Sequence, residues 1–412
     1  MTLSEELAAR GFIHQFSAET AAEILDGERR VVYHGIDPTA DSAHAGNFVN
    51  WMLLRHLAAA GHKVVFLVGG GTGMIGDPKP DVERALTPPE EVAARVVKLR
   101  TQAERIMGGE VVFVNNYDWL GPLDLIGFLR DIGKHFTVNE LIKKDAIATR
   151  LQSETGLSYT EFAYPLLQAY DYLMLYRSHR ATLQVGGSDQ WGNIIAGVDL
   201  IRRVEKATAY ALTVPLIIDK TTGKKFGKSE GNAVWLDAEK TSPYAFYQFW
   251  FNVADENVID YLKLFTILPL EEIMELERGL EVDPGAREAQ RRLAEEVTAF
   301  VHGETAGTQA QRVSATLFGE VAIAELSGEE RALLLANAPV VTVVDGSSLV
   351  DALVAAGLAQ SKREARTFIE SGAITCTGQR VDAVDRVLNR AIDGDLVHVR
   401  RGKKQVALLA LS

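Results

Sequence analysis

Short runs of β-branched residues alternate with long helical patterns over the first half of the chain, and this alternation limits the fold more than any other feature. The runs predict buried strands at Val31–Tyr33, Val64–Val68, Val111–Val114, Leu183–Val185 and Val214–Ile218. Helical patterns such as residues 48–60 and 89–106 lie between them. Strands that alternate with helices form a mainly parallel sheet. The sequence therefore predicts an α/β domain at the start of the chain.

The strand pattern stops near Thr241. Ser242-Pro243 predicts the start of a helix, and Gln290–Val301 predicts another, so this region should be a small all-helical domain. Residues 337–348 contain Pro and Ser and indicate a connector with room for one strand. Residues 349–412 predict two short helices followed by short strands.

Composition bounds the class of protein. A chain of 412 residues is too long for one ordinary core, which favours two to four domains. The chain has no run of about 18 apolar residues and no basic, apolar leader at its start. Its single cysteine, Cys376, excludes an intrachain disulfide framework. We expect a cytoplasmic protein that does not associate with a membrane.

The charge is unevenly distributed. A net charge of −12 argues against a protein that coats nucleic acid over its whole surface. From Gly346 to Ser412 there are ten Lys and Arg against seven Asp and Glu, which gives +3 and leaves −15 for the other residues. A polyanionic partner would therefore be met at the C-terminal end.

Glycine-rich turns follow three of the predicted strands, at Gly35, at residues 69–71 and at residues 186–187. Ligands of parallel sheets bind at the carboxyl ends of the strands. Glycine allows the backbone to approach a ligand closely. The three turns thus indicate a binding site on one rim of the sheet.

Two segments suit phosphate groups. Residues 33–47 lead from a strand into a helix start near Gly46, where free N–H groups attract anions and where Thr39 and His44 add donors. Residues 224–229 place lysines three apart in a loop that can reach a polyphosphate. Taken alone, each segment has an ordinary alternative, a capped strand–helix turn or a solvated basic loop.

Three further features carry polar groups. The glycine-rich turn of residues 68–78 matches neither the P-loop nor the dinucleotide fingerprint, but its Asp77 could hold an ammonium group. Residues 184–193 form another strand–glycine–helix turn, with an Asp and a Gln suited to ribose hydroxyls.

The third feature is a polar stripe. Tyr164, Gln168 and Asp171 are spaced i, i+4, i+7 and share one face of a predicted helix. Three polar groups on an otherwise apolar helix indicate the lining of a pocket. The alternative is a solvent-exposed helix face, but the flanking leucines disfavour full exposure.

In combination these features resemble the class I aminoacyl-tRNA synthetases, and within them the bacterial tyrosyl branch. The HIGH and KMSKS signatures of that family correspond to His44-Ala45-Gly46-Asn47 and to Lys225-Phe226-Gly227-Lys228-Ser229, in that order. The run GGSDQWGN and the helix with the pattern Y-x-x-x-Q-x-x-D are typical of the tyrosyl branch. The resemblance extends over essentially the whole chain.

The resemblance implies a domain layout. It implies a Rossmann-like catalytic domain over residues 1–225, with the signature loop extending to 235. A helical anticodon-recognition domain over 236–330 would follow, then a linker over 331–345. A small α+β RNA-binding domain like that of a ribosomal protein would occupy 346–412. The resemblance also implies a homodimer.

The implied reaction has two steps and needs no protein nucleophile. The carboxylate of L-tyrosine attacks the α-phosphorus of ATP to give tyrosyl-adenylate and diphosphate, and a 3′ hydroxyl of tRNA(Tyr) then attacks the activated carbonyl. Mg²⁺ would accompany ATP, and no protein-bound structural metal is expected. Catalysis would consist of positioning and of stabilising charge on the departing diphosphate.

The resemblance also assigns residues to each task. Those expected to act on the diphosphate are Thr39, His44, Lys225, Lys228 and Ser229, with Lys79 and Arg84 as further candidates. Those expected to bind tyrosine are Tyr33 and Asp171 at the phenol, Asp77, Tyr164 and Gln168 at the ammonium, and Gln190. Those expected beside ATP or the adenylate are Gly35, Asp37, Gly46, Asn47, Gly187, Asp189 and Lys228. Those expected to meet tRNA phosphates are Arg84, Lys362, Arg363, Arg366, Arg400 and Arg401.

Some positions depart from the family pattern. Asn47 replaces the second histidine of HIGH, although an amide can still donate to a ribose oxygen. His34 and Asn50 stand where many relatives carry cysteine and threonine.

Three other functions would share some of these features. A tryptophanyl-tRNA synthetase shares the fold and chemistry, but Tyr33, Asp171 and the C-terminal domain speak against it. A non-catalytic RNA-binding descendant is disfavoured by the retained signature residues. A HIGH-bearing nucleotidyltransferase would usually be short and lack the added domains. The tyrosine assignment requires that Tyr33 and Asp171 meet at the bottom of a pocket, and it fails if they lie far apart or face bulk water.

Overall fold

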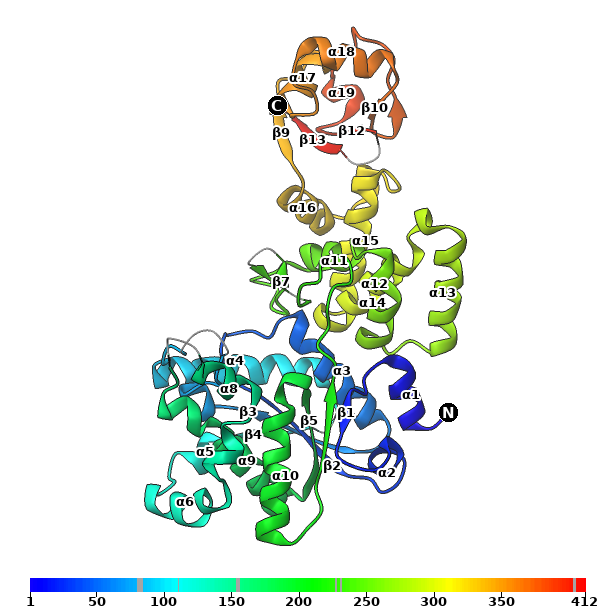
Figure 1. Cartoon of the computed structure of the whole chain (residues 1–412). Helices are drawn as coiled ribbons and strands as arrows, with labels where there is room; N and C mark the ends of the chain where they lie inside the picture. The colour runs from blue at the N-terminus through cyan, green and yellow to red at the C-terminus, as the bar shows by residue number, and fades with distance from the viewer. Residues whose placement is uncertain (80–83, 110, 153–155, 227, 230–231, 403–404) are drawn as a thin grey trace. The chain divides into compact units, whose positions relative to one another are not determined.

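The structure is a computed structural model that describes residues 1–79, 84–109, 111–152, 156–226, 228–229, 232–402 and 405–412 (Figure 1). The side chains of residues 145, 146, 228, 229 and 232 are also left undescribed. The chain divides into two compact units. Unit 1 comprises residues 1–240 and 253–293, and unit 2 comprises residues 241–252 and 294–412.

Unit 1 is built on a six-stranded sheet in the order β1-β6-β5-β2-β3-β4. Its strands are β1 (Gln15–Phe16), β2 (Val31–Ile36), β3 (Lys63–Val68), β4 (Val111–Asn115), β5 (Ala181–Gly187) and β6 (Tyr210–Val214). All pairs are parallel except the edge pair β1–β6. The strand order reverses at β2, which lies between β3 and β5. Ligand sites of doubly wound sheets lie at such a reversal, so the predicted Rossmann-like fold is confirmed.

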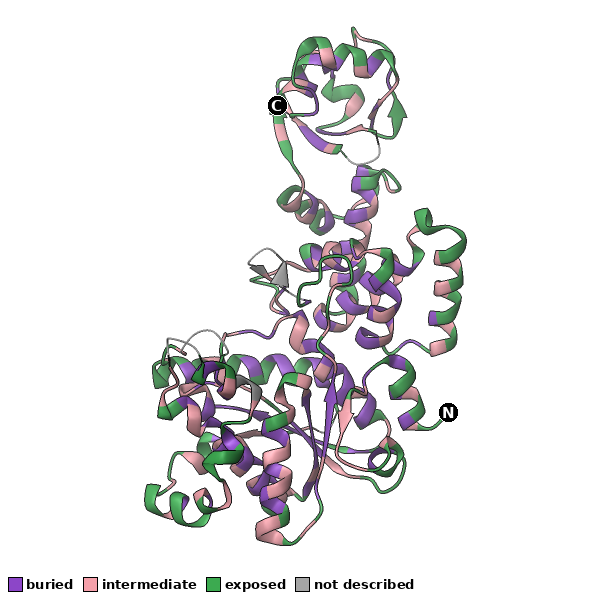
Figure 2. Cartoon of the chain, viewed as in Figure 1, coloured by how far each residue is buried: buried purple, intermediate pink, exposed green. Residues whose placement is uncertain are grey.

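Helices on both sides of this sheet shield its strands, which are mostly buried (Figure 2). The longer helices are α3 (Ala45–Ala59), α4 (Pro89–Met107), α9 (Tyr159–His179) and α10 (Trp191–Glu205). The shorter elements before β6 are α1 (Leu3–Arg10), α2 (Ala21–Leu25), η1 (Thr72–Met74), α5 (Tyr117–Leu120), α6 (Leu125–Asp131), η2 (Gly133–His135), α7 (Val138–Leu141), α8 (Asp145–Leu151) and η3 (Ser188–Gln190). Those after it are β7 (Lys228–Ser229), β8 (Asn232–Ala233), α12 (Asp255–Phe265), α13 (Leu270–Val282) and η4 (Pro284–Ala286).

The orientation of the polar stripe of α9 is set by the core between the sheet and helices α9 and α10. Ala169, Tyr172 and Leu173 of α9 pack with Val65 of β3 in one buried cluster that also contains Leu200 of α10. Because these apolar residues fix the rotation of α9, the neighbouring stripe turns toward the carboxyl ends of the strands.

Two details of the predicted strands are wrong. The fifth strand was predicted at Val214–Ile218 but is β6, Tyr210–Val214. Pro215 follows it and has no N–H to continue the ladder. Gly35 is the second-to-last residue of β2 and residues 186–187 are the last two of β5, so these glycines belong to the strands rather than follow them.

Unit 2 contains helices and a second sheet. Its helices are α11 (Pro243–Phe251), α15 (Glu304–Phe318), η5 (Ile323–Glu325), α16 (Gly328–Asn337), α17 (Leu349–Ala355), α18 (Lys362–Glu370) and α19 (Arg390–Asp393). Helix α14 (Glu288–His302) spans the division between the units. The sheet has the order β11-β10-β12-β13-β9. Its strands are β9 (Val340–Val343), β10 (Ile374–Cys376), β11 (Gln379–Arg380), β12 (Leu396–Arg401) and β13 (Gln405–Leu411).

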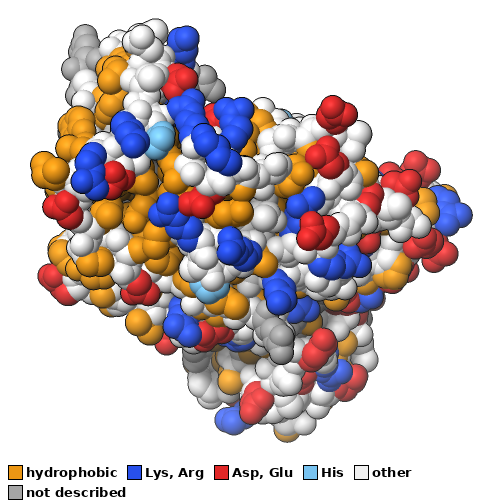
Figure 3. All heavy atoms as spheres, turned by 90° about the horizontal axis from the view of Figure 1, so that it is seen from below, with side chains coloured by type: hydrophobic (Ala, Val, Ile, Leu, Met, Phe, Trp, Pro, Cys, Tyr) orange, Lys and Arg blue, Asp and Glu red, His pale blue; other side chains and the backbone are white. Residues whose placement is uncertain are grey.

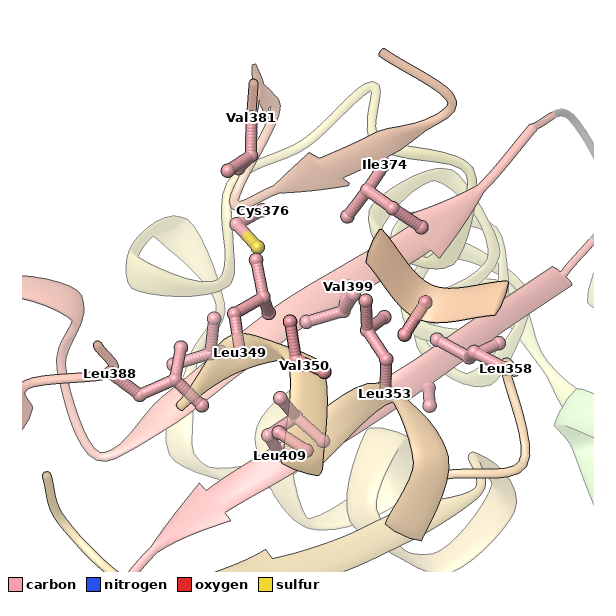
Figure 4. Packing of buried hydrophobic residues seen from close by; sticks show 14 of the residues in the cluster. Leu349, Val350, Leu353, Leu358, Ile374, Cys376, Val381, Leu388, Val399 and Leu409 are labelled. Carbon is pink, nitrogen blue, oxygen red and sulfur yellow. The ribbon is translucent and has the colours of Figure 1, made fainter. Parts of the chain in front are cut away.

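One strand of this sheet lies in the segment expected to be a linker. β9 pairs in parallel with β13, with Val340 opposite Leu408. Helices α17 and α18 contribute to the buried core of the C-terminal part, where Leu353, Val399 and Leu409 point toward one another (Figure 4). The two short helices and following strands predicted for residues 349–412 are confirmed. None of the helices in the described ranges is both long and apolar enough to cross a membrane.

Candidate active site

A cavity of about 400 Å³ opens where β2 and β5 end, at the reversal of strand order. Its volume is in the range of small-molecule sites. The predicted site residues that line it are Tyr33, Gly35, Asp37, Thr39, His44, Gly46, Asn47, Asp77, Arg84, Tyr164, Gln168, Asp171, Gly187, Asp189, Gln190 and Lys225. Segments far apart in sequence are thus brought to one pocket by the sheet topology.

Tyr33 and Asp171 form the buried part of this pocket, at 1% and 3% exposure. Among the described residues, the Tyr33 hydroxyl has no hydrogen-bond partner. The Asp171 carboxylate accepts hydrogen bonds from Trp119 Nε1 at 2.7 Å and Asn116 Nδ2 at 2.9 Å. Burial, and secondly the charge of Asp171, raise the pKa of Tyr33 well above its usual value. The two groups therefore share one cavity and neither faces bulk water.

The pKa of Asp171 is also displaced. Burial raises it from 3.8 to about 7, although the hydrogen bonds from Asn116 and Trp119 act in the opposite direction. This carboxyl is kept out of water, and its donors in the described part of the chain, Asn116 and Trp119, are both neutral. Such a group is poised to accept a hydrogen bond from a ligand that enters the cavity.

A second carboxylate is tied to the first by a chain of hydrogen bonds. Asp37 accepts from Tyr164 Oη and from Thr72 Oγ1, both at 2.7 Å. Asn116 Nδ2, which donates to Asp171, also donates to Thr72 Oγ1 at 2.8 Å. Burial raises the pKa of Asp37 to about 6. A Cβ on Gly69 would stand 2.1 Å from Asp37 Oδ1, so this turn requires glycine.

A third carboxylate, Asp77, completes the acidic side of the pocket. It accepts from Gln190 Nε2 at 2.9 Å and from Asn193 Nδ2 at 3.2 Å, and burial raises its pKa. Gln168 Oε1 is buried in the same cavity with no partner among the described residues. Several acceptors beside buried carboxylates suit a small cation such as a primary ammonium.

The start of α3 forms the opposite side. His44 is the N-cap, and its Nδ1 accepts the Gly46 N–H at 3.0 Å. In a neutral ring this makes Nε2 the N–H donor. Asn47 Oδ1 accepts the His44 N–H at 3.1 Å, so Asn47 completes a capping box. This capping role explains how an asparagine can occupy the position of the second histidine of the signature.

The two signature segments are adjacent. A Cβ on Gly46 would lie 3.3 Å from the Phe226 carbonyl oxygen and 2.9 Å from His44 Cε1. After β7 and β8 the chain returns to the start of α3, where Ala45 N–H donates to Val234 O at 2.8 Å. Lys225 is exposed and lines the pocket, whereas the side chains of Lys228 and Ser229 lie outside the described part of the structure.

The other basic candidates are placed differently. Lys79 is exposed and is not one of the pocket-lining residues, whereas Arg84 lines the pocket and its Nε donates to Asp77 O at 2.9 Å. In unit 2, Arg363 and Arg366 are exposed on α18. On the same helix, Lys362 pairs with Asp351 at 2.6 Å.

Two arginines of β12 make contacts within the protein. Arg400 Nη1 donates to Phe318 O at 2.5 Å, and Arg401 Nη1 donates to Leu358 O at 2.6 Å. The Arg401 guanidinium also lies 4.5 Å from the centre of the Phe368 ring. Both side chains are thus partly committed to holding the fold of unit 2.

Sequence reasoning missed several residues that shape the site, namely Thr72, Asn116, Trp119, Gln184 and Asn193. Asn116 had a detectable signal, because it follows a predicted strand as the glycine turns do. In the described part of the chain no group of three or more His, Cys, Asp or Glu side chains could hold a metal ion.

Comparison with known families agrees with this geometry. The family described as tRNA synthetases class I (W and Y) matches residues 26–319, and the tyrosine–tRNA ligase SYY-like C-terminal domain matches residues 330–409. The chain therefore belongs to the class I tRNA synthetases of the tryptophan and tyrosine type.

Similar proteins narrow the assignment. The chain is 48% identical to a tyrosine–tRNA ligase of Streptococcus mutans over 420 residues, covering 99% of this chain and 100% of that protein. It is 47% identical to the enzyme of Leuconostoc mesenteroides over 416 residues, covering 99% of each. A C-terminally truncated mitochondrial tyrosyl-tRNA synthetase of Aspergillus nidulans superposes with a TM-score of 0.69 at 29% identity, covering 77% of this chain and 94% of that structure. Within the family, the chain falls among the tyrosine–tRNA ligases, which confirms the predicted family, enzyme class and function.

Proposed function

We propose that the pocket of unit 1 binds L-tyrosine at its buried end and ATP at the end formed by α3 and the second signature, and that it forms tyrosyl-adenylate there. The observation that carries this proposal is that one cavity holds both the buried Asp171 carboxylate and the buried Tyr33 hydroxyl, which has no hydrogen-bond partner among the described residues. The phenol of tyrosine donates to Asp171 and accepts from Tyr33. Phenylalanine would leave the Tyr33 hydroxyl without a partner and the remaining acceptor capacity of Asp171 unfilled, which costs about 1–3 kcal/mol for each group.

The ammonium group of tyrosine meets the acidic side of the pocket. Asp77, Tyr164 and Gln168 offer it acceptors, and Gln190 holds the Asp77 carboxylate in place at 2.9 Å. The Tyr164 hydroxyl donates to Asp37 and so presents its remaining lone pair to the cavity. This arrangement aims the carboxylate of tyrosine toward the start of α3.

ATP occupies the rim, where backbone and small polar groups come close. Residues that lie beside the nucleotide are Gly35, Asp37, Gly46, Asn47, Gly187 and Asp189. ATP enters as its magnesium complex. Charge that develops on the diphosphate is stabilised by Thr39, the His44 Nε2–H, Lys225, Lys228, Ser229 and Arg84, because fixed donors gain most where charge appears in the transition state. Arg84, which lines the pocket, is a better candidate for this task than Lys79.

The remaining domains deliver tRNA(Tyr) to the adenylate. We assign residues 236–330 to anticodon recognition and the segment after the linker of 331–345 to RNA binding. The exposed Arg363 and Arg366, with Lys362, form a basic edge on α18 that suits tRNA phosphates. Arg400 and Arg401 are secondary candidates, since each already donates to a backbone carbonyl.

The proposal includes a homodimer in the cytoplasm. Unit 1 exposes large apolar side chains along α6 to α9, between 38% and 73% accessible: Leu125, Ile126, Leu129, Val138, Ile142, Leu151 and Tyr159. Figure 3 shows hydrophobic side chains gathered on the left of this face of unit 1. A patch of this kind marks an interaction surface, and a second copy is the occupant we propose. Sedimentation of the purified chain should give twice the monomer mass, and Ile126→Asp should give monomers.

Diphosphate exchange into ATP across the twenty amino acids tests the activity. Exchange should depend on tyrosine, and exchange supported instead by tryptophan would overturn the assignment. Lys228→Ala should lower the rate of adenylate formation, while adenylate formation by this variant at the wild-type rate would refute the phosphate role of Lys228.

A further inference from the structure

A buried ion pair lies one helical turn beyond the polar stripe of α9. Glu161 precedes Tyr164 by three residues and lies on the same face of the helix. It pairs with Arg150 through two contacts, Nη2 to Oε2 at 3.1 Å and Nη1 to Oε1 at 3.3 Å. The side chains are 2% and 0% exposed. Burying two charges is unfavourable unless their remaining hydrogen-bonding groups are satisfied, so the contacts of this pair show what it holds.

The Arg150–Glu161 pair forms hydrogen bonds with backbone groups outside regular secondary structure. Arg150 Nη1 donates to Lys79 O at 3.0 Å, and Nε and Nη2 donate to Gly156 O at 3.0 and 2.7 Å. Glu161 Oε1 accepts the Arg84 N–H at 3.2 Å. Lys79 and Arg84 lie between η1 and α4 and belong to no helix or strand. The ion pair therefore supplies hydrogen-bond partners that regular secondary structure does not supply here.

This loop carries one charged group of the pocket. Arg84 lines the cavity, and its Nε donates to Asp77 O at 2.9 Å. Its side chain lies over Gly76, where a Cβ would stand 3.1 Å from Arg84 Cγ. The Asp77 carboxylate is held separately by Gln190 and Asn193. The ion pair thus supports the guanidinium, while other contacts support the carboxylate assigned to the tyrosine ammonium.

We infer that Arg150 and Glu161 are positioning residues that hold the Arg84 guanidinium at the phosphate side of the pocket. This inference rests on the proposed function. Neither residue touches substrate; each acts through the backbone at Lys79 and Arg84. Loss of the pair releases that backbone and moves Arg84, so the ATP-dependent step suffers while tyrosine binding does not.

The test is a double-mutant cycle between Glu161→Gln and Arg84→Ala. Tyrosine affinity is measured by equilibrium dialysis without ATP, and kcat and KM for ATP are measured by diphosphate exchange. Glu161→Gln should lower kcat/KM for ATP by about tenfold or more, since small displacements of a charged group are costly. Tyrosine affinity should change by less than about twofold. In the Arg84→Ala background, Glu161→Gln should add less than about twofold, because residues that act through one group are not additive.

Two further variants separate positioning from folding. Arg177→Gln breaks the partly exposed pair with Glu205, whose atoms lie 2.7 Å apart, and should leave both readouts unchanged. Replacing both Arg150 and Glu161 by methionine removes the charges while filling the space, and should give the same selective loss for ATP. A parallel loss of tyrosine affinity, or additive effects with Arg84→Ala, would overturn the inference. Absence of tyrosine-dependent exchange in the wild type would instead refute the proposed function.

Discussion

Replacing Asp171 by asparagine should stabilise the folded protein at neutral pH while impairing tyrosine activation. Asp171 is 3% exposed, and burial raises its pKa from 3.8 to about 7. Among the described residues, its side-chain hydrogen-bond donors are Asn116 and Trp119, and both are neutral. Asparagine has nearly the same shape and stays uncharged at every pH. The substitution therefore removes a buried charge without opening a cavity.

The magnitude follows from the linkage between proton binding and folding. A carboxyl with a pKa of about 7 in the folded state and 3.8 in the unfolded state holds its proton more tightly when folded. Stability is therefore lost as pH rises from about 4 to 7 and levels off above pH 7, with a total of about 4 kcal/mol. The asparagine variant has no such dependence. Its amide leaves one neutral donor poorly paired, at a constant cost of about 1–2 kcal/mol.

The assay is urea unfolding of both proteins between about pH 5 and 8, followed by circular dichroism. The stability of the variant relative to wild type should increase by about 3 kcal/mol across this range. Asp189→Asn is the matched control, because Asp189 lines the same cavity but is exposed, so the same substitution there removes no buried charge. A pH-independent difference for Asp171→Asn would refute the argument that burial of this charge is costly.

The same variant should lose activity. An ionised acceptor for the phenol contributes about 1.5–3 kcal/mol. Tyrosine-dependent exchange at pH 8 should therefore fall at least about tenfold, in a protein that is more stable than wild type. A gain in stability together with a loss of activity would show that the buried Asp171 charge destabilises the fold while it supports tyrosine activation.

Other changes should act at single points of the site. Tyr33→Phe removes a hydroxyl that is buried without a partner among the described residues, so the free energy of unfolding should not fall. The ratio of exchange rates for tyrosine over phenylalanine should drop by about tenfold, and an unchanged ratio would contradict the phenol contact. Gly46→Ala places a Cβ 3.3 Å from Phe226 O and 2.9 Å from His44 Cε1, so adenylate formation should fall by about tenfold or more, whereas Gly192→Ala, whose Cβ would meet Lys144 Nζ at 3.8 Å, should be nearly silent in the same assay. Replacing Arg363 and Arg366 by alanine should lower the slope of log KM for tRNA against log salt concentration by about 1.5 to 2 and leave diphosphate exchange unchanged. An unaltered slope would exclude phosphate contacts by these two arginines of α18.

Local patterns made part of the site predictable. Tyr164, Gln168 and Asp171 could be grouped because helical periodicity alone puts them on one face. Gly69 could be recognised because it lies in a glycine-rich turn after a predicted strand, and Gly46 because it lies at a predicted helix start. These inferences need no knowledge of which strands are neighbours.

Contacts between distant segments were not predictable in this way. Asn116 and Trp119 reach Asp171 only because β4 lies beside β3 and because α5 begins at Tyr117. The resemblance gives both Lys79 and Arg84 as further phosphate candidates, but of the two only Arg84 lines the pocket. A charge in a loop therefore says little until the groups that hold the loop are known.

The two ends of the pocket are stabilised by different interactions, helix capping at the rim and side-chain hydrogen bonds at the buried end. This difference predicts where substitutions are tolerated. At the rim, the start of α3 offers its free backbone N–H groups, so side chains can vary there if they still cap the helix. Asn47 illustrates this, because it replaces a signature histidine and closes the capping box. At the buried end, Asp171, Asn116, Thr72 and Asp37 share a chain of hydrogen bonds, so no member can change without leaving another unpaired. Replacements along this chain of hydrogen bonds should accordingly be more disruptive than replacements of the capping side chains at the rim.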